Sequence, residues 1–198
     1  AGMARCALVV GSETTSRIVD YTDRRTCILF GDAAGAAVVG PPRTAGPSHA
    51  VLSANLYADG RHSKLISIPA GGSARPASRE TCDGKLHYIR LDGREVFRFG
   101  VTKAVEMIKD AMARHNLKAE DIGAIIPHQA NMRIIEGALD RLDLPRELFI
   151  VNLQRYGNTS SASVPLALDE AHRDGRLPAG KPVIMLAFGA GMTWASAV

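Results

Sequence analysis

Apolar and polar positions along the second half of the chain predict strands and helices in turn. From residue 123 onwards, short apolar runs of strand length alternate with segments whose apolar residues recur at helical spacing. A long amphipathic helix, from about Glu95 to His115, precedes them. This order predicts an α/β layered domain. The predicted strands are Gly123 to Pro127, Leu148 to Asn152, Val183 to Phe188 and Thr193 to Val198, and the predicted helices between them are Met132 to Leu142 and Ser161 to Arg173.

The first part of the chain contains more turns. Strands are expected from Cys6 to Gly11 and from Thr26 to Phe30, the latter continuing past Gly31 and Asp32 into Ala33 to Gly40. Prolines and glycines between residues 40 and 47 cannot continue a helix or a central strand. We therefore place a boundary there, between residues 1–46 and 47–198. Further strands are expected at Ala50 to Tyr57, Lys64 to Ile68 and Lys85 to Ile89.

Composition narrows the class of protein without identifying a function. The 198 residues are 46% hydrophobic, enough for a sizeable core, and the net charge of +4 comes from scattered arginines rather than a basic run typical of nucleic-acid binding. No apolar run is long enough to cross a membrane and the N-terminus lacks the pattern of a secretory signal, so cytoplasm is the default expectation. The three cysteines lack metal-ligand spacing, and we expect reduced thiols and no metal site.

Two polar groups follow predicted strands and suggest chemistry. His128, in His-Gln-Ala-Asn, ends the strand that begins at Gly123, and Asn158, in Gly-Asn-Thr, follows the next predicted strand. A neutral imidazole N–H and an amide N–H that are fixed in place before the reaction can stabilise negative charge that develops on an oxygen. Taken singly, each residue is also an ordinary turn residue. Their joint placement favours a pair of oxyanion donors.

With these motifs the chain resembles the β-ketoacyl-acyl carrier protein synthases of type III, thiolase-fold enzymes with a Cys-His-Asn triad. The resemblance implies a thiolase-like layered fold (α-β-α-β-α when complete), of which this chain would be the C-terminal half plus the last strands of the N-terminal half. His128 and Asn158 match two triad members. The resemblance also implies that the nucleophilic cysteine precedes Ala1, because in that family it starts a helix that leads into a strand like Cys6 to Gly11. None of the three cysteines present is expected to replace it, since Cys6 and Cys27 open apolar runs, where a thiol usually behaves as a small buried hydrophobe, and Cys82 lies in a polar loop.

The resemblance also assigns roles to several other residues. The turn Gly189-Ala190-Gly191 would complete the oxyanion hole through the backbone N–H of Ala190, although a tight hairpin explains it equally. Asn131 could equally cap the helix that begins at Met132, as Ser160 or Ser161 could cap the helix that follows, and Arg24 could equally be a solvated loop charge. The roles implied are acyl-channel lining for Phe30 and Phe188, coenzyme A or pantetheine binding for Arg24 and Asn131, and acyl carrier protein binding for Arg133 and Arg98.

The implied reaction is the condensation that starts a fatty-acid chain. An acyl group from acyl-coenzyme A would load the cysteine, and malonyl-acyl carrier protein would then decarboxylate and attack it, with no cofactor and in a homodimer. Chalcone-synthase-like enzymes remain an alternative within the fold. A non-catalytic fragment or partner subunit remains an alternative from another class, since no plausible nucleophile is present. Because half a fold leaves apolar surface uncovered, we predict that residues 1–198 alone are poorly soluble or partly unfolded.

Overall fold

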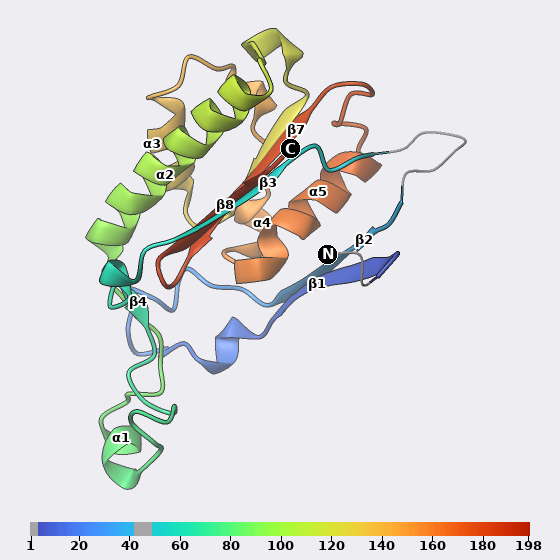
Figure 1. Ribbon diagram of the computed structural model, residues 1–198. Helices are drawn as coiled ribbons and strands as arrows, with labels where there is room; N and C mark the ends of the chain where they lie inside the picture. The colour runs from blue at the N-terminus through green and yellow to red at the C-terminus, as the bar shows by residue number, and fades with distance from the viewer. Residues whose placement is uncertain (1–3, 42–48) are drawn as a thin grey trace.

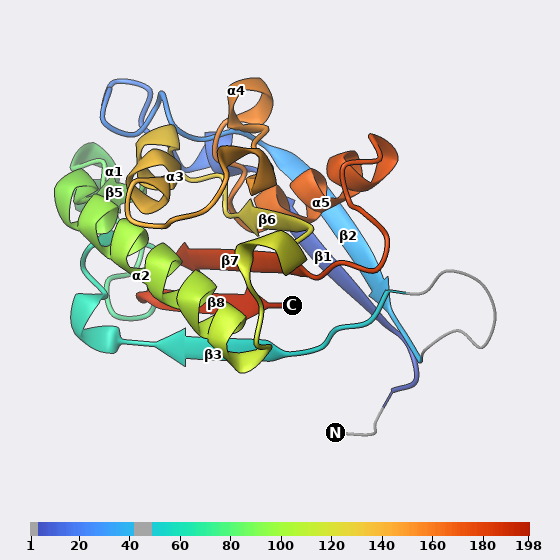
Figure 2. The same cartoon turned by 90° about the horizontal axis from the view of Figure 1, so that it is seen from above.

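The computed structural model describes residues 4–41 and 49–198. The expected boundary between residues 46 and 47 lies outside the described residues and stays a prediction. The described part is built on a four-stranded sheet with the strand order β3-β8-β7-β6. Strands β3 (Ala54–Ala58), β8 (Thr193–Ala197) and β7 (Val183–Gly189) are antiparallel neighbours, whereas β6 (Ala124–Pro127) runs parallel to β7, as Figure 2 shows from above.

Alternating side chains of the sheet enter two different cores. In β7, Ile184 and Leu186 pack with one cluster of buried residues, and Met185 between them packs with another. Helices α2 (Gly93–Arg114) and α3 (Met132–Leu139) supply the first cluster, and α5 (Ser163–Arg173) supplies the second. The sheet is therefore covered on both faces, which suits its nearly continuous apolar strands (Figure 1).

A separate antiparallel pair of strands forms a further layer beyond α5. Strands β1 (Ala7–Glu13) and β2 (Ala33–Val39) pair along their whole length. Gly11 allows this close approach, because a Cβ there would lie 2.5 Å from the carbonyl oxygen of Ser161. The layers run from the β1–β2 pair through α5 and the four-stranded sheet to α2 and α3 (Figure 1), which confirms the α/β layered prediction.

The remaining elements are short and connect these layers. Strands β4 (Ile66–Ser67) and β5 (Arg90–Leu91) pair with each other. Two short helices, α1 (Arg79–Asp83) and α4 (Leu153–Tyr156), and five 3₁₀ turns complete the described part. The 3₁₀ turns are η1 (Thr15–Arg17), η2 (Gly60–His62), η3 (Ala119–Asp121), η4 (Arg146–Leu148) and η5 (Ser160–Ala162).

Three strand predictions are wrong, each for an identifiable reason. The segment from Leu148 to Asn152 touches β6 only through an isolated bridge at Phe149, because the side chain of Gln129 takes hydrogen bonds that a neighbouring strand would use. The segment from Thr26 to Phe30 is mostly turns, since backbone N–H groups there donate to the carbonyl oxygen of Asp23. Only Phe30 pairs, in an isolated parallel bridge to Asn158.

Smaller differences concern element ends and the cysteines. The strand predicted from Lys85 to Ile89 is wrong as well, because these residues form a turn in which Lys85 has a φ of 53° and the strand β5 begins only at Arg90. No serine side chain caps α5, because Ser160 and Ser161 form a 3₁₀ turn before it. Cys6 is exposed rather than buried, and Cys82 lies in the short helix α1 rather than a loop.

The described surface carries large apolar side chains on three strands. Leu8 on β1, Val38 on β2 and Leu56 on β3 are 68%, 74% and 83% exposed. Such a surface is typical of a face that another part of a protein covers. The expectation that residues 1–198 alone are poorly soluble or partly unfolded agrees with this surface and stays a prediction.

Candidate active site

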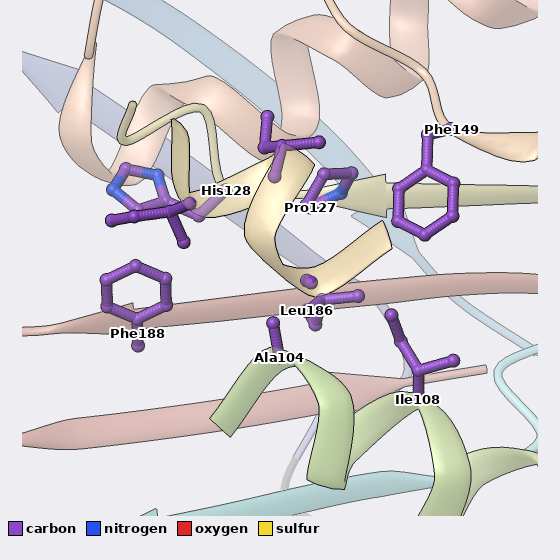
Figure 3. Close-up of a pocket in the computed structure, with 10 residues that line it drawn as sticks. Ala104, Ile108, Pro127, His128, Phe149, Leu186 and Phe188 are labelled. Carbon is purple, nitrogen blue, oxygen red and sulfur yellow. The ribbon is translucent and has the colours of Figure 1, made fainter. Parts of the chain in front are cut away.

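His128 is placed at the carboxyl end of β6 by the parallel ladder. Its backbone N–H donates to the carbonyl oxygen of Leu186 at 2.7 Å, one step beyond the last paired residue, Pro127. The ring of Phe188 on β7 stands edge-on to the imidazole, with centroids 5.7 Å apart, as Figure 3 shows. Ligands of open α/β sheets bind at this end of parallel strands.

The imidazole of His128 is half-buried among apolar side chains. Burial lowers its pKa from 6.5 to about 4, so the ring is neutral at physiological pH. Its Nδ1 atom lies 2.6 Å from the Oγ atom of Ser163, and its Nε2 atom makes no hydrogen bond within the described residues. A neutral imidazole with one free nitrogen suits a hydrogen-bonding role rather than a charged one.

An apolar cavity of about 10 Å³ lies behind the ring of His128. Its walls come from the sheet and from helices α2 and α3 (Figure 3). Space of this size barely admits one water molecule, and an apolar lining disfavours that. The cavity is part of the packing that encloses the imidazole.

Asn158 is held in place by hydrogen bonds of its backbone and of its side-chain oxygen. Its N–H donates to Leu29 and its carbonyl oxygen accepts from Gly31, so that it joins the segment leading into β2. Gly157 before it has a φ of 69°, a conformation that favours glycine. The side-chain Oδ1 atom accepts from the N–H of Ser160 at 2.9 Å. The Nδ2 group is therefore left to donate, and it has no partner within the described residues.

The two residues are linked through Ser163. Asn158 leads through η5 into α5, and the first residue of that helix, Ser163, contacts the imidazole of His128. The structure thus brings the His128 loop and the Asn158 loop to the same region. Neither His128 Nε2 nor Asn158 Nδ2 makes a hydrogen bond to any other described residue.

The turn after β7 follows the strand that lies beside β6. Ala190 is exposed there, and the positive φ of the turn, 137°, falls on Gly191 rather than on Ala190. An alanine therefore fits at this position without backbone strain. Because β6 and β7 are parallel, Ala190 and His128 both follow the carboxyl ends of their strands, at the same edge of the sheet. The role of the Ala190 N–H in an oxyanion hole stays a prediction.

The predicted acyl-channel residues lie close to the two donors. Phe30 is half-buried and bridges to Asn158, whereas Phe188 is 8% exposed and packs in the core against Gly100 of α2. Phe188 supports the imidazole of His128 from below in the view of Figure 3. Channel lining stays a prediction for both residues.

The predicted binding residues lie on exposed loops and helix starts. Arg24 is exposed in a loop where its neighbour Arg25 is paired with Asp23 at 2.9 Å. Asn131 caps α3, since its Oδ1 atom accepts a hydrogen bond from the N–H of Arg133. This confirms the interpretation of Asn131 as a helix cap. The side chain of Arg133 is exposed, and Arg98 on the adjacent α2 is exposed beside Glu95. Their binding roles remain predictions.

Gln129 has no role predicted from the sequence, and the structure shows that its side chain clamps two segments together. It is 1% exposed, and its Nε2 group donates to the carbonyl oxygens of Pro127 and Ile150 while its Oε1 atom accepts from the N–H of Asn152. These bonds join the end of β6 to the segment that leads into α4. The signal available in the sequence was an amide directly after the histidine.

A second polar network supports the loop that carries Asn158. Glu170 on α5 accepts hydrogen bonds from Tyr156, the last residue of α4, and from Asn152, which directly precedes that helix, and it pairs with Arg155 at 3.0 Å. The Tyr156 hydroxyl and the Asn152 amide hold the pKa of Glu170 below its usual range. Glu170 thereby ties α4, and the turn after it, to α5.

Two absences concern only the part of the chain that the structure describes. There, no group of three or more His, Cys, Asp or Glu side chains is arranged to hold a metal ion. Among the same residues, no helix combines the length and the apolar character needed to cross a membrane.

Comparisons with solved structures define the class of fold. A synthase III from Thermus thermophilus superposes with a TM-score of 0.85 at 42% identity, covering 99% of this chain and 59% of that one. A 3-oxoacyl-(acyl carrier protein) synthase III from Pseudomonas aeruginosa PAO1 gives a TM-score of 0.85 at 38% identity, covering 99% and 58%. The fold is therefore the thiolase-like α/β fold of these condensing enzymes.

Sequence comparisons define the family. Residues 1–60 match the model of 3-oxoacyl-[acyl-carrier-protein (ACP)] synthase III, and residues 112–198 match the model of its C-terminal part. The β-ketoacyl-[acyl-carrier-protein] synthase III of Caldanaerobacter subterraneus subsp. tengcongensis is 49% identical over 197 residues, and that of Clostridioides difficile is 44% identical. The chain belongs to the 3-oxoacyl-[acyl-carrier-protein] synthase III family. It spans 59% of the length of both relatives.

Proposed function

We propose that His128 and Asn158 are the oxyanion-stabilising donors of a β-ketoacyl-acyl carrier protein synthase III. The observation that carries this proposal is that His128 Nε2 and Asn158 Nδ2 make no hydrogen bond within the described residues, on a neutral imidazole and on an amide whose Oδ1 atom accepts from the N–H of Ser160. Family membership supports the reaction class. The reaction would also require a nucleophilic cysteine, a role that we assign to none of Cys6, Cys27 and Cys82.

The condensation has two half-reactions. In the first, the cysteine thiolate attacks an acyl-coenzyme A thioester, forming an acyl-cysteine and releasing coenzyme A. In the second, malonyl-acyl carrier protein loses carbon dioxide, and the electron pair of the broken bond passes into the enolate of its thioester. His128 and Asn158 donate hydrogen bonds to that enolate oxygen. The enolate carbon then attacks the acyl-cysteine, and the thiolate leaves.

The partners in this proposal are an acyl-coenzyme A, an acyl carrier protein and a second copy of the enzyme. Arg24 and Asn131 would contact coenzyme A or the pantetheine arm. Arg133 and Arg98 are exposed at the starts of adjacent helices, where they would orient an acidic carrier protein.

The two half-reactions can be measured separately in the complete protein expressed from its full reading frame. His128→Ala and Asn158→Ala should each slow the decarboxylation of malonyl-acyl carrier protein by about 10²- to 10³-fold, the usual effect of removing one oxyanion donor. Acylation of the cysteine by acyl-coenzyme A, followed by mass spectrometry, should be largely retained. His172→Ala, at an exposed position on α5, serves as the control. Equal loss of both half-reactions in the two variants would contradict the assignment.

A further inference from the structure

The hydroxyl of Ser163 has two close partners in the described structure, and both belong to the His128 loop. Ser163 is the first residue of α5 and is 1% exposed. Its Oγ atom lies 2.6 Å from Nδ1 of His128 and 3.4 Å from the backbone nitrogen of Gln129. Neither contact is needed to form α5, which has no side-chain cap.

The positions of the hydrogens follow from the chemistry of these three groups. A backbone N–H can only donate, so the weak contact with Gln129 directs a hydrogen at Oγ. If Nδ1 of His128 also carried a hydrogen, the hydroxyl hydrogen of Ser163 would have no acceptor among the described residues. A buried donor left without a partner costs about 1–3 kcal/mol. The arrangement of lower energy has the Ser163 hydroxyl donating to Nδ1, and the ring hydrogen on Nε2.

The position of Ser163 in its helix acts in the same direction. The amino end of an α-helix carries a partial positive charge, which disfavours a second proton on a nearby imidazole. Ser163 occupies the first turn of an 11-residue helix and contacts the ring directly. The helix and the hydroxyl both favour a neutral ring that accepts at Nδ1. A neutral imidazole kept next to a helix start is a known way of making an electrophilic donor.

We propose that Ser163 is a positioning residue that fixes His128 in the tautomer with its proton on Nε2. This inference rests on the proposed function, in which Nε2–H donates to the thioester oxygen. The opposite tautomer presents a lone pair to that oxygen, and the interaction becomes repulsive. Ser163 touches no reacting atom and acts through His128 alone.

Nitrogen-15 NMR of the complete protein, labelled at histidine, tests the tautomer without any measurement of activity. In the wild type, the His128 Nε2 shift should be that of a protonated nitrogen and the Nδ1 shift that of an acceptor. In Ser163→Ala the two shifts should move towards each other as both tautomers become populated. Ser163→Thr, which keeps the hydroxyl, should restore the wild-type pattern. Ser161→Ala is the matched control, because Ser161 is exposed and its hydroxyl bonds to Glu13 instead.

Kinetic measurements on the same variants provide a second test. Ser163→Ala should lower kcat for malonyl-acyl carrier protein decarboxylation by about 10- to 10²-fold, as expected when a catalytic imidazole is misplaced or takes the wrong tautomer. KM and the rate of cysteine acylation should not change. A wild-type His128 protonated on Nδ1, or shifts unaltered by Ser163→Ala, would overturn the proposal. If instead the shifts behave as expected but His128→Ala decarboxylates normally, the proposed function fails and the tautomer assignment stands.

Discussion

The depressed pKa of His128 predicts a specific loss of stability in mild acid. Burial lowers this pKa from 6.5 to about 4 in the folded protein. Between these values the unfolded chain binds a proton at His128 and the folded chain does not, so the free energy of unfolding falls as the pH falls. The contribution is fully present above pH 6.5 and fully lost below about pH 4. Each pH unit in this window costs about 1.4 kcal/mol, which amounts to about 2 kcal/mol at pH 5 and about 3 kcal/mol in all.

The comparison that isolates this contribution uses His128→Gln, which keeps a polar side chain that does not titrate. Urea unfolding of the complete protein is measured at pH 7.5 and pH 5.0 for both proteins. The wild type should lose about 2 kcal/mol more than His128→Gln over this interval. Carboxylates with lowered pKa values, such as Asp32 and Glu170, also lose stabilisation in acid, but they are present in both proteins and cancel.

His172→Gln is the matched control, because it removes an exposed histidine. It should lose as much stability as the wild type between the two pH values. An equal loss in wild type and His128→Gln would show that the imidazole titrates normally when folded. In that case burial would not be what keeps the imidazole of His128 neutral.

Three further changes test the surroundings of the site in the complete protein. Gly100→Ala should destabilise it by about 1–3 kcal/mol and shift the NMR signals of His128, because a Cβ at Gly100 would lie 2.7 Å from Cζ of Phe188. Gly93→Ala, in the same helix with no atom within 4 Å of the new Cβ, should do neither, and equal effects in thermal unfolding would contradict this packing. Gln129→Leu should lower the free energy of unfolding in urea by about 3 kcal/mol, since it leaves three buried backbone groups unpaired, whereas the exposed Gln154→Leu should change it little. A similar change in both glutamine variants would show that the clamp contributes nothing. Arg133→Glu should raise KM for malonyl-acyl carrier protein about 10-fold and leave KM for acyl-coenzyme A unchanged, because a surface charge steers an acidic partner. Arg173→Glu, on α5 on the other side of the sheet, should alter neither constant, and if Arg133→Glu raises neither constant the carrier-protein site lies elsewhere.

The layered fold was predictable because its signals are local. Alternation in β7 and helical spacing in α2 each follow from burial of one face, and both elements lie where the sequence predicts them. The segment from Phe149 to Asn152 has the same apolar character as a strand. It fails to become one because Gln129, twenty residues earlier, occupies its hydrogen-bonding groups. Pairing supplied by a side chain cannot be read from periodicity.

The candidate site was predictable only in part, for a similar reason. His128 and Asn158 follow apolar runs and belong to short motifs, so the sequence singles them out. Ser163 lies among three serines at residues 160, 161 and 163 that look alike as helix caps. Only the fold shows that one of them contacts the imidazole at 2.6 Å, while the two before it form a turn. Contacts over 35 residues depend on how the layers pack.

The central claim is that His128 and Asn158 donate hydrogen bonds to a thioester oxygen. Difference infrared spectroscopy tests it directly in the complete protein, with a bound 3-ketoacyl thioester labelled with carbon-13 at the thioester carbonyl. If both side chains donate, the carbonyl stretching band lies at lower frequency than in water, and it moves to higher frequency in His128→Ala and in Asn158→Ala but not in Ser161→Ala. A band that neither substitution moves would contradict it.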